Sequence, residues 1–443
     1  MFLERIRIAN FKSLKDVEVR PSGLTTLVGP NNAGKTNFAL AMKFLADIPR
    51  RGLESAIGEA GGLHSIVRRK TQRSRRPIAF ELDVSFSPRG EQPELAGALA
   101  GLSDVVGGAV TRVAMGYGFS LRASGNGLHG EFAVAEENLR VSVQTDRHLQ
   151  RGTELVLYDV SRDAKGALHI EIPKRNAYTR RLRSYVDSFA ALACRAQRGR
   201  ETLRMSPQEI LLGLPLGSDP FLYALSAAVR GISAFRFSPS SARHPGPPTP
   251  NPVLGWEGDA LAALIEWLPQ RNKKRWSEVL GSMRDIVPGL KDIVVERLPS
   301  GALGVSFVEE GFSRPWHVNE VSDGTIQVLC MLLAVTDPQA WALVIEEPEN
   351  SLHPWMVRQI GQRFRKLAEE KTVILTTQSP VVIDMLFPEE VWIVSRKKGQ
   401  TSIRRLTDLD QRIGSDWREG KIGLSEYLDM GLMPCAVPGG GDG

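Results

Sequence analysis

The stretch Gly29-Pro30-Asn31-Asn32-Ala33-Gly34-Lys35-Thr36 is the part of this sequence that decides the fold. An apolar run, Leu24 to Val28, precedes it, and a helix-forming stretch, Asn37 to Ala46, follows it. A strand, a loop of the form GxxxxGK[ST] and a helix, in this order, are typical of a phosphate-binding loop. The stretch therefore predicts a site for the phosphates of a nucleotide.

The residue types in this loop have chemical reasons. Glycine permits unusual backbone dihedral angles, so Gly29 and Gly34 allow consecutive N–H groups to point at phosphate oxygens. Lys35 adds a positive charge for the β- and γ-phosphates, and the Thr36 hydroxyl is a ligand for Mg²⁺. The helix that follows directs the positive end of its dipole at the same anion. ATP and Mg²⁺ are thus the expected ligands, and the expected contacts are Gly29, Asn31, Asn32, Ala33, Gly34, Lys35, Thr36 and Asn37.

Length and composition are those of an ordinary globular chain. The 443 residues are 42% hydrophobic and 24% charged, which allows a large core and two lobes or domains. The sequence has no run of about 18 apolar residues and no signal-peptide pattern, so we expect no membrane contact. Three widely spaced cysteines, Cys194, Cys330 and Cys435, argue against disulfides or a zinc site and favour the reducing cytoplasm.

Four consecutive segments are expected along the chain. Residues 1–175 hold the phosphate loop and a run of alternating strands that predicts an antiparallel, β-rich section. Residues 176–311 are largely helical in composition and contain a proline-rich linker at 238–253. Residues 312–400 alternate buried strands with helices, which predicts a parallel α/β sheet, and residues 401–443 form a tail. No long heptad array is present, so no long coiled coil is expected.

A basic run lies between the phosphate-loop helix and the next strand. With a net charge of +6, the chain could contact nucleic acid. A solvated loop and a nucleic-acid-binding loop are about equally compatible with this run, because no aromatic residues interleave to stack on bases. Its six basic residues are Arg68, Arg69, Lys70, Arg73, Arg75 and Arg76.

Two adjacent carboxylates follow a buried strand in the last third of the chain. Glu346 and Glu347 come directly after the apolar run Ala342 to Ile345. Ligands bind outside the carboxyl ends of the strands in a parallel sheet, so both side chains are expected near the phosphate loop. The first acid is placed to hold hydrated Mg²⁺, and the second to polarise an attacking water. The alternative interpretation is a solvated acidic start of a helix.

Two further segments can be assigned a function only from the order of the motifs along the chain. Ser322 and Gly324 precede an apolar helix, where they form either an anion site or a simple N-terminal cap. Gln378 lies in the polar turn that closes the strand Val373 to Thr376, within expected reach of a γ-phosphate. Taken alone, the first would be interpreted as a cap and the second as a turn.

Together, these motifs resemble the ABC-type ATPases of the SMC/RecF/OLD group. More narrowly, they are similar to the stand-alone ATPases with a Ser-Asp-Gly-Thr signature and a Glu-Glu-Pro-Glu-Asn Walker B motif that occur in anti-phage defence systems such as PARIS and Septu. The resemblance covers about residues 1–48 and 312–396, and loosely 232–311. It implies an α/β head with a mixed, partly parallel sheet, a β-rich N-terminal section and a helical insertion.

The resemblance also implies roles for single residues. Glu346 corresponds to the Walker B acid on the Mg²⁺ side, and Glu347 to the catalytic glutamate. Ser322 and Gly324 correspond to the signature that contacts the γ-phosphate held by a second subunit, so a homodimer or higher homo-oligomer through the ATP sites is implied. The D-loop corresponds to Asn350 through His353, and a segment near the nucleotide to Asn10, Phe11 and Lys12.

One departure affects the expected rate. The switch position is commonly histidine in this group, whereas this chain has Gln378. Glutamine forms hydrogen bonds with phosphate but carries no charge and cannot shuttle a proton, so slow hydrolysis is expected. No Q-loop glutamine is placed between the phosphate loop and the β-rich section.

Three functional hypotheses remain. The first is an ATPase sensor or scaffold of an anti-phage defence complex, with a separate nuclease or toxin as effector, because the tail after residue 396 is too short for a nuclease domain. The alternative is a RecF-like DNA-binding ATPase of DNA repair, using the basic run. The third is a nucleotide-gated scaffold with little turnover. A transporter subunit is disfavoured because such subunits carry Leu-Ser-Gly-Gly-Gln.

Overall fold

The computed structural model describes residues 1–68, 76–87, 103, 108–123, 132–146, 154–163, 165–171, 204–213 and 220–429. The chain forms two compact units that interleave along the sequence. Unit 1 comprises Met1–Pro21, Phe44–Ile232 and Lys398–Ser402, and unit 2 comprises Ser22–Lys43, Ser233–Lys397 and Ile403–Gly443. The chain passes from one unit to the other within helix α1 (Lys35–Arg51) and strands β9 (Ile232–Phe235) and β16 (Gln400–Arg405).

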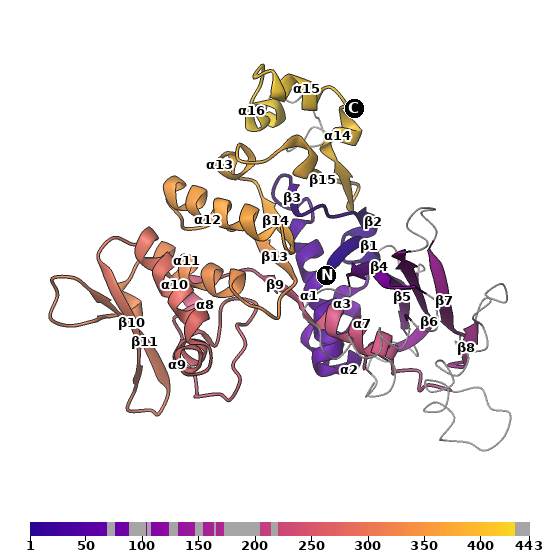
Figure 1. Cartoon of the computed structure of the whole chain (residues 1–443), viewed down its shortest axis with the longest axis horizontal. Coiled ribbons are helices and arrows are strands. Elements are labelled where there is room, and N and C mark those ends of the chain that lie inside the picture. Colours follow the sequence, from indigo (N-terminus) through magenta and orange to yellow (C-terminus); the bar gives the residue numbers. More distant parts are fainter. Residues whose placement is uncertain are drawn as a thin grey trace. The chain divides into compact units, whose positions relative to one another are not determined.

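Unit 1 is built on antiparallel strands in the order β8-β7-β6-β5-β4-β1-β2. Alternate residues of β4 face the core, as its period-two pattern predicts. There the Phe80 ring stacks on Phe119, with ring centroids 5.3 Å apart, and meets Phe11 edge-on at 5.8 Å. The expected β-rich antiparallel section is therefore present (Figure 1). The elements of unit 1 are β1 (Phe2–Phe11), β2 (Leu14–Val19), α2 (Leu53–Glu59), α3 (Leu63–Ile66), β4 (Ile78–Phe86), β5 (Val110–Ala123), β6 (Phe132–Thr145), β7 (Leu155–Arg162), β8 (Leu168–Glu171), η1 (Leu211–Gly213) and α7 (Pro220–Arg230).

Unit 2 is built on a parallel sheet. Its strand order is β15-β3-β14-β13, with β9 beside β13, and β3 pairs in parallel with both neighbours. All five residues of β3 and of β13 are buried, as expected for strands covered on both faces. The elements of unit 2 are β3 (Leu24–Val28), α8 (Pro239–Ala242), α9 (Leu261–Arg271), α10 (Lys273–Ile286), β10 (Leu290–Arg297), β11 (Leu303–Glu309), β12 (Trp316–His317), η2 (Val318–Glu320), α11 (Asp323–Val335), β13 (Ala342–Glu346), α12 (Pro354–Leu367), β14 (Thr372–Thr377), α13 (Pro380–Ile383), η3 (Pro388–Glu390), β15 (Val391–Lys397), α14 (Leu406–Leu409), α15 (Ile413–Arg418) and α16 (Leu424–Asp429).

The core of unit 2 lies between the parallel sheet and its helices. Helix α11 is apolar on every side and is buried from Gly324 to Ala334, where it packs against α8, α10 and α12. The β10–β11 hairpin packs on α9 and α10 (Figure 1). These features confirm the α/β fold with a mixed sheet and a parallel core. The longest helix in the described ranges has 17 residues, too short for a long coiled coil.

Two segments differ from the sequence-based expectation. Helix α1 begins at Lys35, two residues before the expected Asn37, and continues past Pro49 to Arg51. Pro49 cannot donate the backbone hydrogen bond that a residue inside a helix normally makes, and the helix ends two residues after it. The proline-rich stretch 238–253 begins with the short helix α8 and packs within unit 2, where Gly246 forms a β-bridge with Leu303. In the part of the chain that is described, no helix combines the length and apolarity needed to span a membrane.

Candidate nucleotide site

The phosphate loop joins the carboxyl end of β3 to α1, inside unit 2. Its first glycine is required for close approach, because a Cβ at Gly29 would lie 2.1 Å from the carbonyl oxygen of Val394 on β15. This differs from the expected need for an unusual dihedral angle. Gly34 does meet that expectation, with φ +115°, and Asn32 also adopts a positive φ, of 66°. The loop backbone is thus shaped by both residue choice and the neighbouring strand.

Lys35 is folded into the loop. Its side-chain Nζ donates hydrogen bonds to the carbonyl oxygens of Gly29 (2.6 Å) and Pro30 (3.1 Å), and only 5% of the residue is exposed. Burial lowers the pKa of Lys35, and nearby carboxylates, first Glu347 and then Glu346, act in the opposite direction. The ammonium group is therefore placed inside the loop, where a phosphate would meet it.

Thr36 and Glu346 form the candidate magnesium site. The Thr36 hydroxyl donates a hydrogen bond to Oε1 of Glu346, which lies at the end of β13 and is 3% exposed. The other oxygen, Oε2, is buried and accepts no hydrogen bond from the described residues. Burial raises the pKa of Glu346, so a cation would stabilise its charged form. A hydroxyl and an unpartnered carboxylate oxygen fit the preference of Mg²⁺ for oxygen ligands.

The described residues offer no group of three or more His, Cys, Asp and Glu side chains able to hold a metal. Magnesium here would accordingly depend on Thr36, Glu346, water and the phosphates themselves, which is how Mg²⁺ is usually bound. When bound, the ion would neutralise charge on the β- and γ-phosphates.

Glu347 is oriented by a tight turn. Its φ is 46°, its N–H donates to the carbonyl oxygen of Thr376 (2.9 Å), and its Oε2 accepts from Nδ2 of Asn350 (3.0 Å). The side chain lines the same pocket as Lys35 and Thr36. A carboxylate held in this position can accept a proton from a water that attacks the γ-phosphate.

The signature residues lie at the start of α11. Ser322 caps the helix, because its Oγ accepts a hydrogen bond from the Thr325 N–H (3.2 Å), and an additional role as an anion site stays a prediction. A Cβ at Gly324 would lie 2.8 Å from the carbonyl oxygen of Ser351, which means that glycine is needed for the D-loop to approach the helix. Neither Ser322 nor Gly324 is among the described residues that line the phosphate-loop pocket.

The switch residue Gln378 is exposed and follows β14. Its N–H donates to Oε1 of Glu349 (3.4 Å), an oxygen that also accepts the hydroxyl of Thr377. The strand ends that carry Glu346 and Gln378 are adjacent, because Glu346 pairs with Thr376. The sequence had not singled out Glu349, although its position two residues after Glu347 was a usable signal.

Two arginines also support the site and were missed. Arg396 donates to the side chain (2.6 Å) and the carbonyl (3.3 Å) of Asn32 in the phosphate loop. A basic residue at the end of a strand beside β3 could have indicated it. Arg243, in the proline-rich stretch, donates to the carbonyls of Val318 and Val321 and pairs with Asp323. No local pattern marks that residue.

Some expected site residues lie in unit 1. Asn10 and Lys12 form the left-handed turn between β1 and β2, with φ of 57° and 47°. Lys12 N–H donates to the Ile66 carbonyl (2.7 Å), and the Phe11 side chain is buried among aromatic rings. Their contact with nucleotide stays a prediction.

The structure describes only the two ends of the basic run. Arg68 donates its N–H to the carbonyl of Asn10 (2.9 Å) and its side-chain Nε is buried, whereas Arg76 is exposed. The other members, Arg69, Lys70, Arg73 and Arg75, fall outside the described residues, so the nucleic-acid role stays a prediction.

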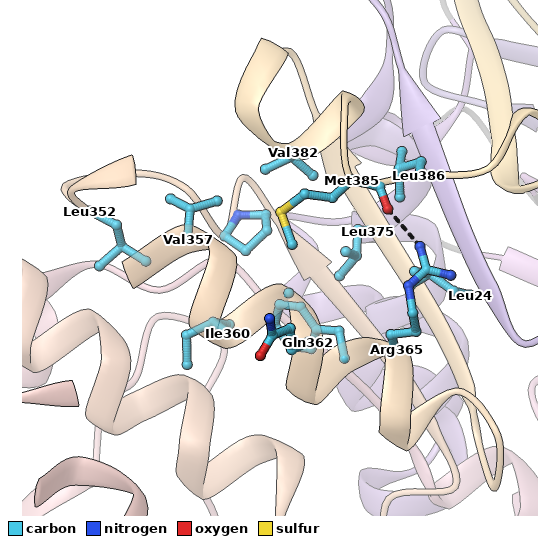
Figure 2. Close-up of a pocket in the computed structure, with 13 residues that line it drawn as sticks. Leu24, Leu352, Val357, Ile360, Gln362, Arg365, Leu375, Val382, Met385 and Leu386 are labelled. Carbon is cyan, nitrogen blue, oxygen red and sulfur yellow. Dashed lines mark hydrogen bonds between the residues drawn. The ribbon is translucent and has the colours of Figure 1, made fainter. Parts of the chain in front are cut away.

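An apolar pocket lies beside the Walker B turn, between α12, α13 and the ends of β3 and β14 (Figure 2). Pro348 and Leu352 line it on the turn side, and Val382 and Met385 on the α13 side. Figure 2 shows the Arg365 guanidinium donating to the Met385 carbonyl (2.6 Å), which joins α12 to the segment after α13. The pocket shares no lining residue with the phosphate-loop pocket.

Comparisons with known proteins match separate parts of the chain. Residues 236–384 match the family described as "AAA domain, putative AbiEii toxin, Type IV TA system", and residues 1–86 match the family "AAA ATPase domain". The DNA replication and repair protein RecF of Beutenbergia cavernae is 30% identical over 87 residues, 19% of this chain and 22% of that protein. RecF of Paenarthrobacter aurescens is 30% identical over 88 residues, with the same shares. The chain thus spans 22% of the length of these relatives.

Two solved structures also align. An Smc head bound to the C-winged helix domain of ScpA has a TM-score of 0.44 at 13% identity, covering 91% of this chain and 97% of that one. The SMC head domain from Thermotoga maritima has a TM-score of 0.41 at 11% identity, covering 91% and 99%.

The two matched families are both ATPase domains, and the matched segments contain every motif of the site. Residues 1–86 hold the phosphate loop, and residues 236–384 hold the signature, both Walker B acids and the switch. Lys35, Thr36, Glu346 and Glu347 meet in one place with the partners that their chemistry requires. Two matches to ATPase domains thus meet around one candidate nucleotide site, which indicates a P-loop ATPase.

Proposed function

We propose that the chain is an ATPase that dimerises around ATP and serves as the sensor or scaffold of an anti-phage defence complex with a separate effector. The observation that carries the dimer is the separation of two phosphate-binding features. The phosphate loop and Glu347 line one pocket, whereas the signature residues Ser322 and Gly324 do not line it among the described residues. A signature that is absent from its own nucleotide pocket is available to the pocket of a second copy.

The start of α11 has the properties of an anion site. The helix has 13 residues, so its N-terminal N–H groups and dipole attract negative charge. Ser322 presents an exposed side chain there, whereas Gly324 is buried and lets Ser351 pack closely against the start of the helix. In the dimer, this helix start would bind the γ-phosphate on Lys35 of the other copy. ATP would then hold two copies together, and hydrolysis would release them.

Within each site, the residues have distinct roles. Lys35 and the loop N–H groups bind the β- and γ-phosphates, Thr36 and Glu346 orient Mg²⁺, and Glu347 accepts a proton from the attacking water. Gln378 offers hydrogen bonds but no charge, so turnover is slow and the ATP-bound dimer is long-lived. A long-lived ATP state suits a scaffold that waits for a signal.

Dimerisation is tested with the Glu347→Gln variant, which binds ATP but lacks the base. Its sedimentation coefficient should rise from that of a monomer to that of a dimer when ATP and Mg²⁺ are added. The double variant Glu347→Gln/Ser322→Arg is the matched control, because an arginine at the signature obstructs the second phosphate. Equal sedimentation of Glu347→Gln with and without ATP would contradict the proposal.

A mixing experiment tests whether the two halves of the site come from different copies. Lys35→Ala and Ser322→Arg should each be inactive, because each destroys one half of both sites. In a mixed dimer, one site regains an intact phosphate loop and an intact signature, so the mixture should recover part of the wild-type ATPase activity. A mixture that stays inactive under conditions where the chains exchange would show that each copy completes its own site.

The description of one matched family supports the biological setting, and identifying the binding partners tests it. The family matched by residues 236–384 is described in terms of a Type IV TA system, whereas the RecF relatives act in DNA replication and repair. Co-purification with Glu347→Gln under ATP should retain a nuclease or toxin from the native host. Retention of duplex DNA alone, with a salt-sensitive affinity, would instead favour a RecF-like role.

A further inference from the structure

The carboxylate of Glu349 connects the Walker B turn to the switch segment. Its Oε1 accepts the hydroxyl proton of Thr377 (2.5 Å) and the N–H of Gln378 (3.4 Å). The Thr377 hydroxyl oxygen in turn accepts the N–H of Ser379 (2.9 Å). One carboxylate oxygen therefore organises three consecutive residues at the end of β14.

The same turn is tied to β14 at a second point. The Glu347 N–H donates to the carbonyl of Thr376 (2.9 Å), one residue before the segment that Glu349 holds. Glu347 and Glu349 of the Walker B turn thus form hydrogen bonds with consecutive residues, 376 to 378, at the end of β14. The backbone of Gln378 is consequently fixed relative to the catalytic base.

Glu349 retains a feature that packing alone would not favour. Its Oε2 is buried and accepts no hydrogen bond from the described residues, and burial raises the pKa of the carboxyl. A buried polar atom without a partner destabilises the folded state. The hydrogen-bond acceptor at Oε1 is thus kept at this position although burial of the carboxyl is unfavourable, which points to a role for the bonds to Thr377 and Gln378.

We propose that Glu349 is a positioning residue that holds the switch Gln378 in register with the base Glu347 for ATP hydrolysis. The proposal rests on the ATPase function given above. Glu349 is not among the described residues that line the phosphate-loop pocket, and its side chain accepts hydrogen bonds from Thr377 and Gln378, so it acts on the switch segment. Hydrolysis requires the γ-phosphate, the water and the switch to be aligned within a fraction of an ångström, and loss of such alignment lowers the rate of the chemical step more than substrate binding.

The test is a set of steady-state ATPase measurements on the full chain. Glu349→Ala should lower kcat about tenfold or more while KM for ATP changes by less than about threefold, because the phosphate loop is untouched. Glu349→Gln should restore most of the rate, since its amide oxygen still accepts from Thr377 and Gln378. Glu389→Ala is the matched control, because Glu389 makes an exposed pair with Arg418 away from the site.

Action through the switch is tested by a double-mutant cycle. If Glu349 works by holding Gln378, then Glu349→Ala/Gln378→Ala should be no slower than Gln378→Ala alone. Losses that multiply, or a Glu349→Ala variant with the wild-type kcat, would overturn the proposal. Thermal unfolding of each variant separates misfolding from lost positioning, and Thr377→Val removes the same hydrogen bond with a side chain of equal size should Glu349→Ala not fold.

Failure of the role proposed for Glu349 can be distinguished from failure of the proposed ATPase function. A wild-type chain that binds ATP but never hydrolyses it would contradict the ATPase proposal itself. Hydrolysis by the wild type, together with an unchanged rate in Glu349→Ala and Thr377→Val, would overturn only the role of Glu349.

Discussion

Glu137 is a buried carboxyl group of unit 1 whose protonation changes with pH. Its side chain is completely buried, accepts hydrogen bonds from the Tyr117 hydroxyl and from the Leu211 N–H (2.7 Å), and lies 3.5 Å from Nη1 of Arg162. Arg162 also donates to the carbonyls of Ser206 and Glu209, so the pair fastens a distant segment to the strands. Burial raises the pKa of Glu137 to about 7.

This raised pKa predicts the sign of a pH effect. Between about pH 4.5 and 7 the folded chain holds a proton on Glu137 that the unfolded chain has lost, so this group's contribution to stability falls as pH rises. The free energy of unfolding of the wild type, minus that of Glu137→Gln, should decrease by about 3 kcal/mol across this window. Urea unfolding at several pH values measures it, and parallel pH profiles for the two chains would refute it.

Single residues also show where sequence reasoning succeeds. The roles of Lys35, Thr36 and Glu346 follow from local spacing, because a phosphate loop and a strand-end acid need only their immediate neighbours to be recognised. Gly29 was identified for the wrong physical reason, since its constraint comes from Val394 on a strand more than three hundred residues later. Such a contact leaves no trace in local sequence.

At the level of elements, Arg243 braces the segment that carries the signature. Its guanidinium donates to the carbonyls of Val318 (3.1 Å) and Val321 (2.7 Å) and pairs with Asp323 in the first turn of α11. These three contacts fix the path of the chain into the helix. The brace thus links the proline-rich stretch, which the sequence presented as a linker, to the expected dimer surface.

Removal of this brace should weaken the ATP-bound dimer. Arg243→Ala leaves two carbonyls and a carboxylate without their partner, a loss of about 1–3 kcal/mol that falls on the placement of Ser322. In the Glu347→Gln background, the dimer should therefore dissociate at a higher protein concentration, which sedimentation measures. Arg314→Ala, which breaks an exposed pair with Glu320 in the same region, should leave dimerisation unchanged.

The types and order of the helices and strands could largely be predicted from the sequence. The side-chain contacts between segments distant in the sequence could not. Strands β4 and β14 follow from period-two alternation and from a short apolar run, because these patterns record burial directly. The hydrogen bond between Glu349 and Thr377 and the contacts of Arg243 each join segments that are far apart in the sequence. A hydrogen bond of one side chain to a distant strand end has no periodicity to detect.

At the scale of the whole chain, the two units are interleaved, which the sequence did not reveal. Strand β16 returns to unit 1 near the end of the chain, where Thr401 pairs with Leu14 and its hydroxyl lies 2.7 Å from that of Ser13. All the nucleotide-site residues placed around the phosphate loop belong to unit 2. Binding of ATP should therefore stabilise unit 2 directly.

This division predicts a selective response to nucleotide. ATP with Mg²⁺ at about 100 times its Kd should stabilise the folded state of unit 2 by about 2.7 kcal/mol, because binding to the folded state alone shifts the unfolding equilibrium by mass action. Hydrogen exchange should slow in β3, the start of α1 and the end of β13, and stay unchanged in β4 to β7. The Ser322→Arg chain keeps the comparison within a monomer, and Lys35→Ala should abolish the effect. Equal protection of both units in the Ser322→Arg chain, or protection that persists in Lys35→Ala, would contradict a site contained in unit 2.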